Sequence, residues 1–124
     1  MKILVVDDEE LLVKGIRFNL QNDGYQVVTG SNGREAIELA RDPDIRLIVL
    51  DVMMPVMDGF EASRAIRALD RPDAATVPIL AMTAQASDEC AQSCHQVGMN
   101  GRLVKPLDAK KLAKSIREAV QNKQ

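Results

Sequence analysis

The chain has 124 residues, of which 46% are hydrophobic and 27% are charged, and its 16 basic and 18 acidic side chains give a formal net charge of −2. This length supports one domain with one core, and the balance of charge argues against a nucleic-acid-binding module, which normally has a basic surplus. Two cysteines are too few for a disulfide scaffold, and the first apolar run is too short for a signal peptide or a membrane span. We therefore expect one cytoplasmic domain over residues 1–124, without direct contact to nucleic acid or membrane.

The first half of the chain predicts three strands, with a helix after each of the first two. Strands are indicated by short apolar runs rich in β-branched residues, and helices by apolar residues three or four positions apart. In chain order these elements are the strand Ile3–Val6, a helix with Leu12, Ile16 and Leu20 on one face, the weak strand Tyr25–Thr29, a helix from Ser31-Asn32-Gly33 to Asp42-Pro43, and the strand Leu47–Leu50. The weak second strand suits the edge of a sheet, whereas the fully apolar first and third strands suit its centre.

The second half of the chain continues this alternation of helices and strands. Its elements are a helix from about Asp58-Gly59 that buries Phe60, Ile66 and either Ala62 or Leu69, the strand Val77–Met82, a helix from Ser87 to Gly98, the strand Leu103–Val104, and a helix capped by Asp108 with Leu112, Ile116, Ala119 and Val120 on one face. Strands that alternate with helices require crossover connections, which give a parallel sheet with helices on both faces. Ligands of such sheets bind beyond the carboxyl ends of the strands.

Charged and polar side chains follow four of the five predicted strands. The first strand ends in Asp7-Asp8, the third in Asp51, the fourth in Thr83 and the fifth in Lys105-Pro106. Because the carboxyl ends of parallel strands lie at one edge, we expect these groups to converge on one shallow pocket. Two like charges about 4 Å apart repel by roughly 4 kcal/mol at an effective dielectric constant near 20. Three carboxylates therefore need a cation, protonation or both.

This set of groups predicts phosphoryl chemistry with a divalent ion. Lys105 supplies one positive charge and a divalent ion supplies two, which neutralises three carboxylates. Oxygen ligands with no histidine or cysteine nearby favour Mg²⁺ over zinc. An aspartate can form an aspartyl-phosphate, and a metal ion, a lysine and a hydroxyl stabilise a phosphoryl group in transfer. Each residue alone also has a structural interpretation as a helix cap, a turn or a strand end, so the prediction depends on the four strand ends together.

Four segments of the chain resemble the receiver (CheY-like) domain of two-component response regulators, and the resemblance covers essentially the whole length. They are Ile3–Asp8, Leu50–Pro55 with Asp58-Gly59, Pro78–Ala84, and Gly98–Pro106. The expected fold class is α/β: a single-domain (βα)5 flavodoxin-like fold, with a five-stranded parallel sheet of order 2-1-3-4-5 and helices on both faces. The stretches 57–62 and 98–101 are most similar to receivers of hybrid kinases and phosphorelays.

The resemblance implies a role for each acidic residue. It implies that Asp51 accepts a phosphoryl group from a phosphohistidine on a sensor histidine kinase or a histidine phosphotransfer protein. It also implies that Asp7, Asp8 and Asp51 bind Mg²⁺ together with the backbone carbonyl of Met53. We further expect a downstream effector protein as a partner, and a monomer or weak dimer.

The resemblance also assigns the basic and hydroxyl groups, with one departure. It implies that Thr83 and Lys105 contact the attached phosphoryl group, and that a cis peptide before Pro106 aims Lys105 into the pocket. Receivers usually carry an aromatic residue three positions before this lysine, whereas this chain has Arg102. Because an unpaired guanidinium is costly to bury, we expect Arg102 to stay outward and the switch to depend on Thr83.

Two other function classes remain open from the residues themselves. A haloacid-dehalogenase-like phosphatase also uses an aspartate nucleophile with lysine and Mg²⁺, but it usually has a second aspartate where this chain has Met53, and it has a cap domain. An unphosphorylated flavodoxin-like interaction module would carry a phosphate loop rich in Ser, Thr and Gly after the first strand, which is missing. The receiver prediction implies no enzyme, because such a domain catalyses only its own phosphorylation and dephosphorylation.

Two further groups of side chains are predicted to be structural. Cys90 and Cys94, with His95 beside them, suggest a metal site, but both cysteines share an apolar face with Val97. In a reducing cytosol such buried cysteines act as small hydrophobes. The methionines between residues 53 and 57 are expected to pack at the edge of the loop, and the lysines of the last helix to face solvent.

Overall fold

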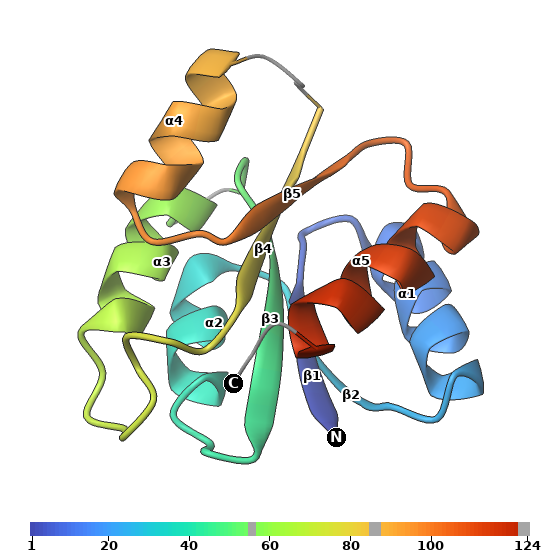
Figure 1. The fold of residues 1–124 in the computed structure, drawn as a ribbon, viewed down its shortest axis with the longest axis horizontal. Coiled ribbons are helices and arrows are strands. Elements are labelled where there is room, and N and C mark those ends of the chain that lie inside the picture. Colours follow the sequence, from blue (N-terminus) through green and yellow to red (C-terminus); the bar gives the residue numbers. More distant parts are fainter. Residues whose placement is uncertain (55–56, 85–87, 122–124) are drawn as a thin grey trace.

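The computed structural model describes residues 1–54, 57–84 and 88–121, with the side chains of the fourth helix described from Gln92 onward. Strands and helices alternate along this part of the chain (Figure 1). The elements are β1 Lys2–Val6, α1 Glu10–Asn22, β2 Gln26–Gly30, α2 Gly33–Leu39, β3 Ile45–Asp51, α3 Gly59–Arg67, β4 Ile79–Thr83, α4 Asp88–Gln96, β5 Gly101–Val104 and α5 Ala109–Gln121. No helix within the described ranges is both long enough and apolar enough to span a lipid bilayer.

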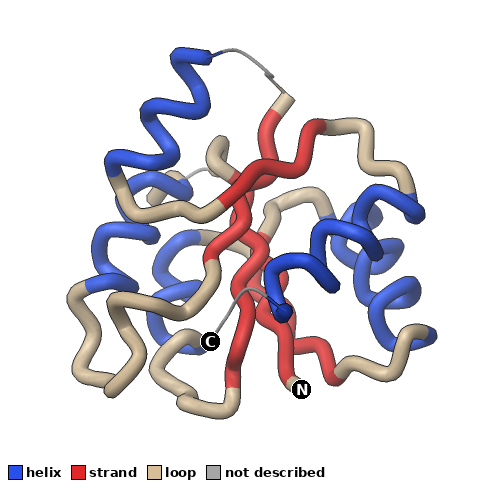
Figure 2. Tube along the Cα trace, viewed as in Figure 1, coloured by secondary structure: helices blue, strands red, loops and turns tan. Residues whose placement is uncertain are grey.

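The strands form one parallel sheet of order β2-β1-β3-β4-β5, which confirms the predicted fold class. Figure 2 shows the sheet running through the middle of the molecule, with helices on both sides. Helices α1 and α5 cover one face, and α2, α3 and α4 cover the other (Figure 1). The weak second strand lies at an edge, as expected, and β3 lies at the centre.

Alternate side chains of the strands build two apolar layers, one on each face of the sheet. Leu4, Val6, Ile48 and Leu50 pack beneath α2, α3 and α4, while Ile3, Val5, Leu47 and Val49 pack beneath α1 and α5. Burying one such side chain stabilises the fold by about 1.5–3 kcal/mol. A slip of one residue would exchange the two layers, so this alternation fixes the register and the positions of the residues that follow each strand.

Several strand boundaries differ from the predicted ones by one or two residues: β3 spans Ile45–Asp51 rather than Leu47–Leu50, and β5 begins at Gly101 rather than Leu103. β4 differs at both ends. The strand begins at Ile79 rather than Val77 and includes Thr83. Val77 instead belongs to a turn in which its N–H donates to the carbonyl of Asp73 at 2.8 Å, and Pro78 has no N–H for a strand ladder. In α3, Ala62 and Ile66 are buried as expected, but Phe60 is half-buried and Leu69 lies beyond the end of the helix.

Two arginines hold the amino edge of the sheet. Arg71 is 7% exposed, and its guanidinium donates to the carbonyls of Ala40, Asp42 and Ile45 and to the carboxylate of Asp73. These bonds use all five N–H groups of the side chain. They connect the turn after α3 to the segment between α2 and β3.

Arg67, the last residue of α3, makes a similar connection. It donates to the carbonyls of Ala74, Val77 and Gly98 and to Oδ1 of Asn100. Gly98 has a φ of 87°, and a side chain there would meet Arg67. The start of β4 and the start of β5 are therefore tied to the same helix.

Candidate functional site

The structure brings the predicted site residues to the carboxyl edge of the sheet. Asp7 follows β1, Asp51 ends β3, Thr83 ends β4 and Lys105 follows β5. β1, β3, β4 and β5 are neighbours in the sheet, and the backbone N–H of Lys105 donates to the carbonyl of Thr83 at 2.8 Å. Topology therefore gathers residues separated by almost the whole chain.

The backbone around Asp51 is shaped by the loop that leads to α3. Oδ1 of Asp51 accepts a hydrogen bond from the N–H of Met53 at 3.3 Å, and the N–H of Gly59 donates to the carbonyl of Val52 at 3.2 Å. A side chain at residue 59 would overlap the carbonyl oxygen of Asp51. Gly59 is therefore required for this close approach, a role that the sequence analysis did not assign to it.

Three carboxylates form a compact group at this edge. Oxygen atoms of Asp7, Asp8 and Asp51 lie within 4.8 Å of one another. Asp7 and Asp51 are each 2% exposed, whereas Asp8 is exposed. Oδ1 of Asp7 accepts from the N–H of Glu9 at 2.9 Å, and its buried Oδ2 faces the ammonium of Lys105 at 3.0 Å without a well-aligned hydrogen bond. A buried oxygen left in this way, among other hard oxygen donors, fits a Mg²⁺ site.

Lys105 is the cation that faces these carboxylates. Its Nζ lies 3.0 Å from Oδ2 of Asp7, 3.3 Å from Oε1 of Glu9 and 3.5 Å from Oδ1 of Asp51. Partial burial lowers the pKa of Lys105, but the carboxylates of Asp7, Asp51 and Glu9 outweigh that effect, so the pKa is raised above its usual value. The peptide between Lys105 and Pro106 is cis, as predicted. One ammonium is thus shared among three carboxylates.

The environment of Asp51 opposes its ionisation. Burial first, and then the charge of Asp7, raise the pKa of Asp51 to about 6, against the opposing effects of the Met53 N–H and of Lys105. The ionised carboxylate is therefore poorly stabilised at neutral pH without a further cation. A divalent ion at this edge would remove that penalty.

Glu9 is the member of this group that the sequence analysis did not identify. It stands directly after the two predicted metal ligands and at the N-cap of α1, where its side chain forms no capping hydrogen bond. Its carboxylate instead accepts from Nζ of Lys105 at 3.3 Å. Glutamate is a poor N-cap residue, and that mismatch is the sequence signal that could have identified it.

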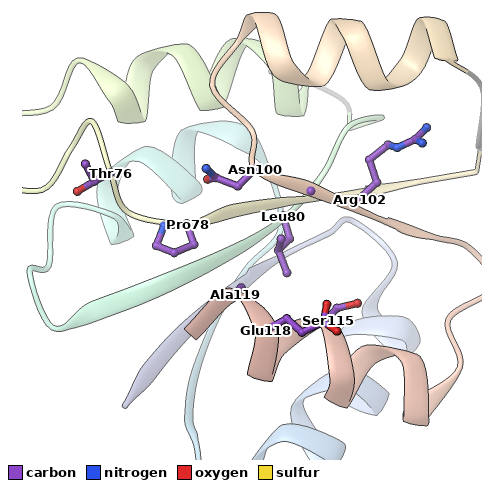
Figure 3. A pocket seen from close by; sticks show the side chains of 9 residues that line it. Thr76, Pro78, Leu80, Asn100, Arg102, Ser115, Glu118 and Ala119 are labelled. Carbon is purple, nitrogen blue, oxygen red and sulfur yellow. The ribbon is translucent and has the colours of Figure 1, made fainter. Parts of the chain in front are cut away.

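Arg102 lies on β5, away from the carboxylates. It is half-buried and lines a cavity of about 410 Å³ between the sheet and α5, together with Leu80 and Ser115. Figure 3 shows its guanidinium extending away from Leu80 and from α5. This orientation agrees with the expectation that Arg102 points outward.

The cysteine and methionine groups fit the structural interpretation where the structure describes them. Cys94 is buried, His95 is exposed, and the side chain of Cys90 lies outside the described residues. Met54 and Met57 pack against the core beneath α2 and α3, whereas Met53 is exposed and does not pack against it. Within the described residues, the carboxylate group is the one cluster suited to a metal ion.

Comparison with known proteins agrees with this geometry. A model of the response regulator receiver domain matches residues 3–117. The hybrid signal transduction protein dokA of Dictyostelium discoideum is 38% identical over 114 residues, which are 92% of this chain, and the chain spans 7% of that relative's length. The chemotaxis protein CheY4 of Vibrio cholerae has a similar structure, with a TM-score of 0.89 and 37% identity over 95% of this chain and 97% of that one.

A second solved structure with a similar fold contains a metal ion. It is the receiver domain of the sensor histidine kinase PA1611 from Pseudomonas aeruginosa PAO1, with a magnesium ion coordinated in its active site cleft. The TM-score is 0.87, and the identity is 32% over 98% of both chains. None of these similarities supports the phosphatase or the unphosphorylated interaction module.

Proposed function

Because the chain belongs to the response regulator receiver domain family, we propose that Asp51 accepts a phosphoryl group from a phosphohistidine on a partner protein. The observation that carries this proposal is the 2% exposed carboxylate of Asp51, which lies within reach of Asp7, Asp8 and the ammonium of Lys105. A buried carboxylate with a raised pKa and no compensating divalent charge is unfavourable for stability, and such groups occur at functional sites. The whole chain, residues 1–124, would act as this one domain.

Mg²⁺ is the cofactor that suits these ligands. Asp7, Asp8 and Asp51 would bind it with the backbone carbonyl of Met53, and the close grouping of the three carboxylates around a single ammonium supports this assignment. When bound, the ion supplies positive charge to the phosphoryl oxygens. Its two charges, with that of Lys105, balance the three carboxylates.

The proposed step changes bonds only at Asp51 and at the donor. One carboxylate oxygen of Asp51 attacks phosphorus, the O–P bond of an acyl phosphate forms, and the N–P bond breaks with its electron pair returning to the imidazole nitrogen. Lys105 and Thr83 undergo no covalent change. Their ammonium and hydroxyl groups would contact the phosphoryl oxygens and stabilise the transferred charge.

The same chemistry leads us to propose a phosphoryl donor and a downstream partner. A sensor histidine kinase or a histidine phosphotransfer protein would supply the phosphoryl group, and a downstream effector protein would bind the phosphorylated form. Hydrolysis would be limited to the domain's own acyl phosphate, so no free substrate is expected.

The test is phosphorylation by acetyl phosphate in the presence of Mg²⁺. We expect one phosphoryl group, stable in acid and labile in base, on the wild-type chain and none on Asp51→Asn. The matched control is Asp58→Asn in the same loop, because asparagine caps a helix as well as aspartate does and Asp58 caps α3. Label that persists in Asp51→Asn, or that is lost from Asp58→Asn, would contradict the assignment.

A further inference from the structure

Helix α1 begins differently from α2 and α3. The N-cap side chains of α2 and α3, Asn32 and Asp58, each accept a hydrogen bond from the backbone N–H three residues further on, at 3.0 and 2.9 Å. At the N-cap of α1 the side chain of Glu9 makes no such bond. It reaches across the site instead and accepts from Nζ of Lys105 at 3.3 Å. The carboxylate of Glu9 therefore contacts the site and does not cap its own helix.

Glu9 adds a charge that the site does not need for balance. The carboxylates of Asp7, Asp8 and Asp51 are neutralised by Lys105 and one divalent ion, so Glu9 leaves one negative charge in excess. Its side chain is 64% exposed, and that of Lys105 is 20% exposed. An ion pair with one such exposed partner adds little to stability, so the fold does not explain why Glu9 contacts Lys105.

The three distances at Lys105 indicate what this contact does. Nζ is 3.0 Å from Asp7 and 3.3 Å from Glu9, but 3.5 Å from Asp51. The contact with Asp51 is the longest of the three, although the proposed transfer requires the ammonium beside the group attached to Asp51. Glu9 and Asp7 therefore compete with Asp51 for the one ammonium.

We propose that Glu9 is a positioning residue that competes with Asp51 for the ammonium of Lys105 and thereby slows phosphoryl transfer to this chain. The inference rests on the proposed function of Asp51. Two effects act in the same direction: the Glu9 carboxylate competes for the ammonium, and its negative charge repels the incoming phosphoryl group. Removing it should raise the maximal rate of phosphorylation by roughly three- to tenfold, the size expected for one partly solvated charge contact.

Three variants separate the contact from the charge. Glu9→Gln removes the charge and leaves only a weaker, neutral acceptor for the ammonium, Glu9→Asp keeps the charge on a side chain one methylene shorter, and Glu10→Gln removes a neighbouring charge whose ion-pair partner is Lys14 at 3.9 Å. Each protein is phosphorylated with increasing phosphoramidate, a small donor that needs no docking surface, at saturating Mg²⁺. The maximal rate, the half-saturating donor concentration and the Mg²⁺ affinity are measured separately, together with urea unfolding.

We expect Glu9→Gln and Glu9→Asp to raise the maximal rate, and Glu10→Gln to change it by less than about twofold. An equal rise in Glu10→Gln would show a general effect of charge and would overturn the proposal. So would a wild-type rate in Glu9→Asp or in Glu9→Gln. If the wild-type chain takes no phosphoryl group on Asp51, the proposed function itself fails. If the wild-type chain is phosphorylated on Asp51 but the Glu9 variants are phosphorylated at the same rate, the proposed function stands and this inference alone fails.

Discussion

Buried charged side chains are paired differently at the two edges of the sheet. At the amino edge, Arg71 is 7% exposed and all five of its N–H groups donate to carbonyls or to Asp73. At the carboxyl edge, Asp7 and Asp51 are 2% exposed, and the one ammonium of Lys105 faces both carboxylates, at 3.0 Å and 3.5 Å.

This difference distinguishes a structural charge from a functional one. A buried ion whose hydrogen-bonding groups are all paired stabilises the arrangement of the segments it connects, and losing it is strongly destabilising. A buried ion with incomplete partners destabilises the isolated fold and is ready for a ligand. We therefore expect the side chains at the amino edge to stabilise the fold, and those at the carboxyl edge to bind the metal ion and take part in phosphoryl transfer.

The largest expected effect is the loss of the Arg71 connection. Arg71→Ala should lower the free energy of unfolding by about 3–5 kcal/mol, because it leaves Asp73 and the carbonyls of Ala40 and Ile45 without their donor. Urea unfolding measures this, with Arg64→Ala on the exposed side of α3 as the control, which should stay within about 0.5 kcal/mol. If Arg71→Ala lowers the free energy of unfolding by less than about 1 kcal/mol, the buried charge at the amino edge does not stabilise the fold as the comparison requires.

A substitution at the opposite edge should stabilise the metal-free protein. The pKa of Asp51 is raised to about 6 by burial and by Asp7, so the folded state binds its proton more tightly than the unfolded state does. The stability contributed by the protonated form is present below about pH 4 and is lost as pH rises through 6. Asp51→Asn should therefore be more stable than wild type by about 1–3 kcal/mol at pH 7.5 in EDTA.

The pH dependence provides the control for that prediction. The difference between Asp51→Asn and wild type should shrink as the pH falls from 7.5 to 4, as measured by urea unfolding at each pH. Equal stabilities at pH 7.5, or a difference that does not depend on pH, would mean that Asp51 is not strained in the folded state.

Mg²⁺ should reverse the instability of the carboxyl edge. At 100 times its dissociation constant, a ligand that binds only the folded state stabilises it by about 2.7 kcal/mol. We expect Mg²⁺ to raise the midpoint of thermal unfolding of the wild-type chain and to have a much smaller effect on Asp8→Asn. The exposed Asp44 offers the matched control Asp44→Asn. An unchanged response of Asp8→Asn would remove β1 from the metal site.

The smallest expected effect at the site belongs to Arg102. Its side chain extends away from Leu80 and lies on β5 rather than among the carboxylates (Figure 3), so Arg102→Ala should change the phosphorylation rate and Mg²⁺ affinity by less than about twofold. Phosphoramidate labelling and calorimetry measure these two quantities. A tenfold change in either would place Arg102 within the switch and contradict its outward role.

The sequence predicted what depends on periodicity and on strand order. Alternating apolar residues and crossover helices are enough to place Asp7, Asp51, Thr83 and Lys105 at one edge. The predicted start of β4 was wrong because Val77, although apolar, lies in a turn, where its N–H donates to the carbonyl of Asp73.

Contacts between distant residues could not be predicted in this way. Arg71 donates to carbonyls 26 to 31 positions away, and Glu9 and Lys105 are 96 positions apart. Neither contact follows a helix or strand period, because each depends on how elements pack after the sheet has formed. The sequence therefore predicted which carboxylates and which lysine gather at this edge, but not the contact between Glu9 and Lys105.

The most direct test of the central claim is calorimetric titration with beryllofluoride, which mimics a phosphoryl group on an aspartate, and this method suits a chain without tryptophan. The wild-type chain should bind one equivalent in Mg²⁺ and show no binding in EDTA, and Asp51→Asn should show no binding in either buffer. Binding that persists in EDTA, or in Asp51→Asn, would contradict the account of the carboxyl edge as a Mg²⁺-dependent phosphoacceptor site.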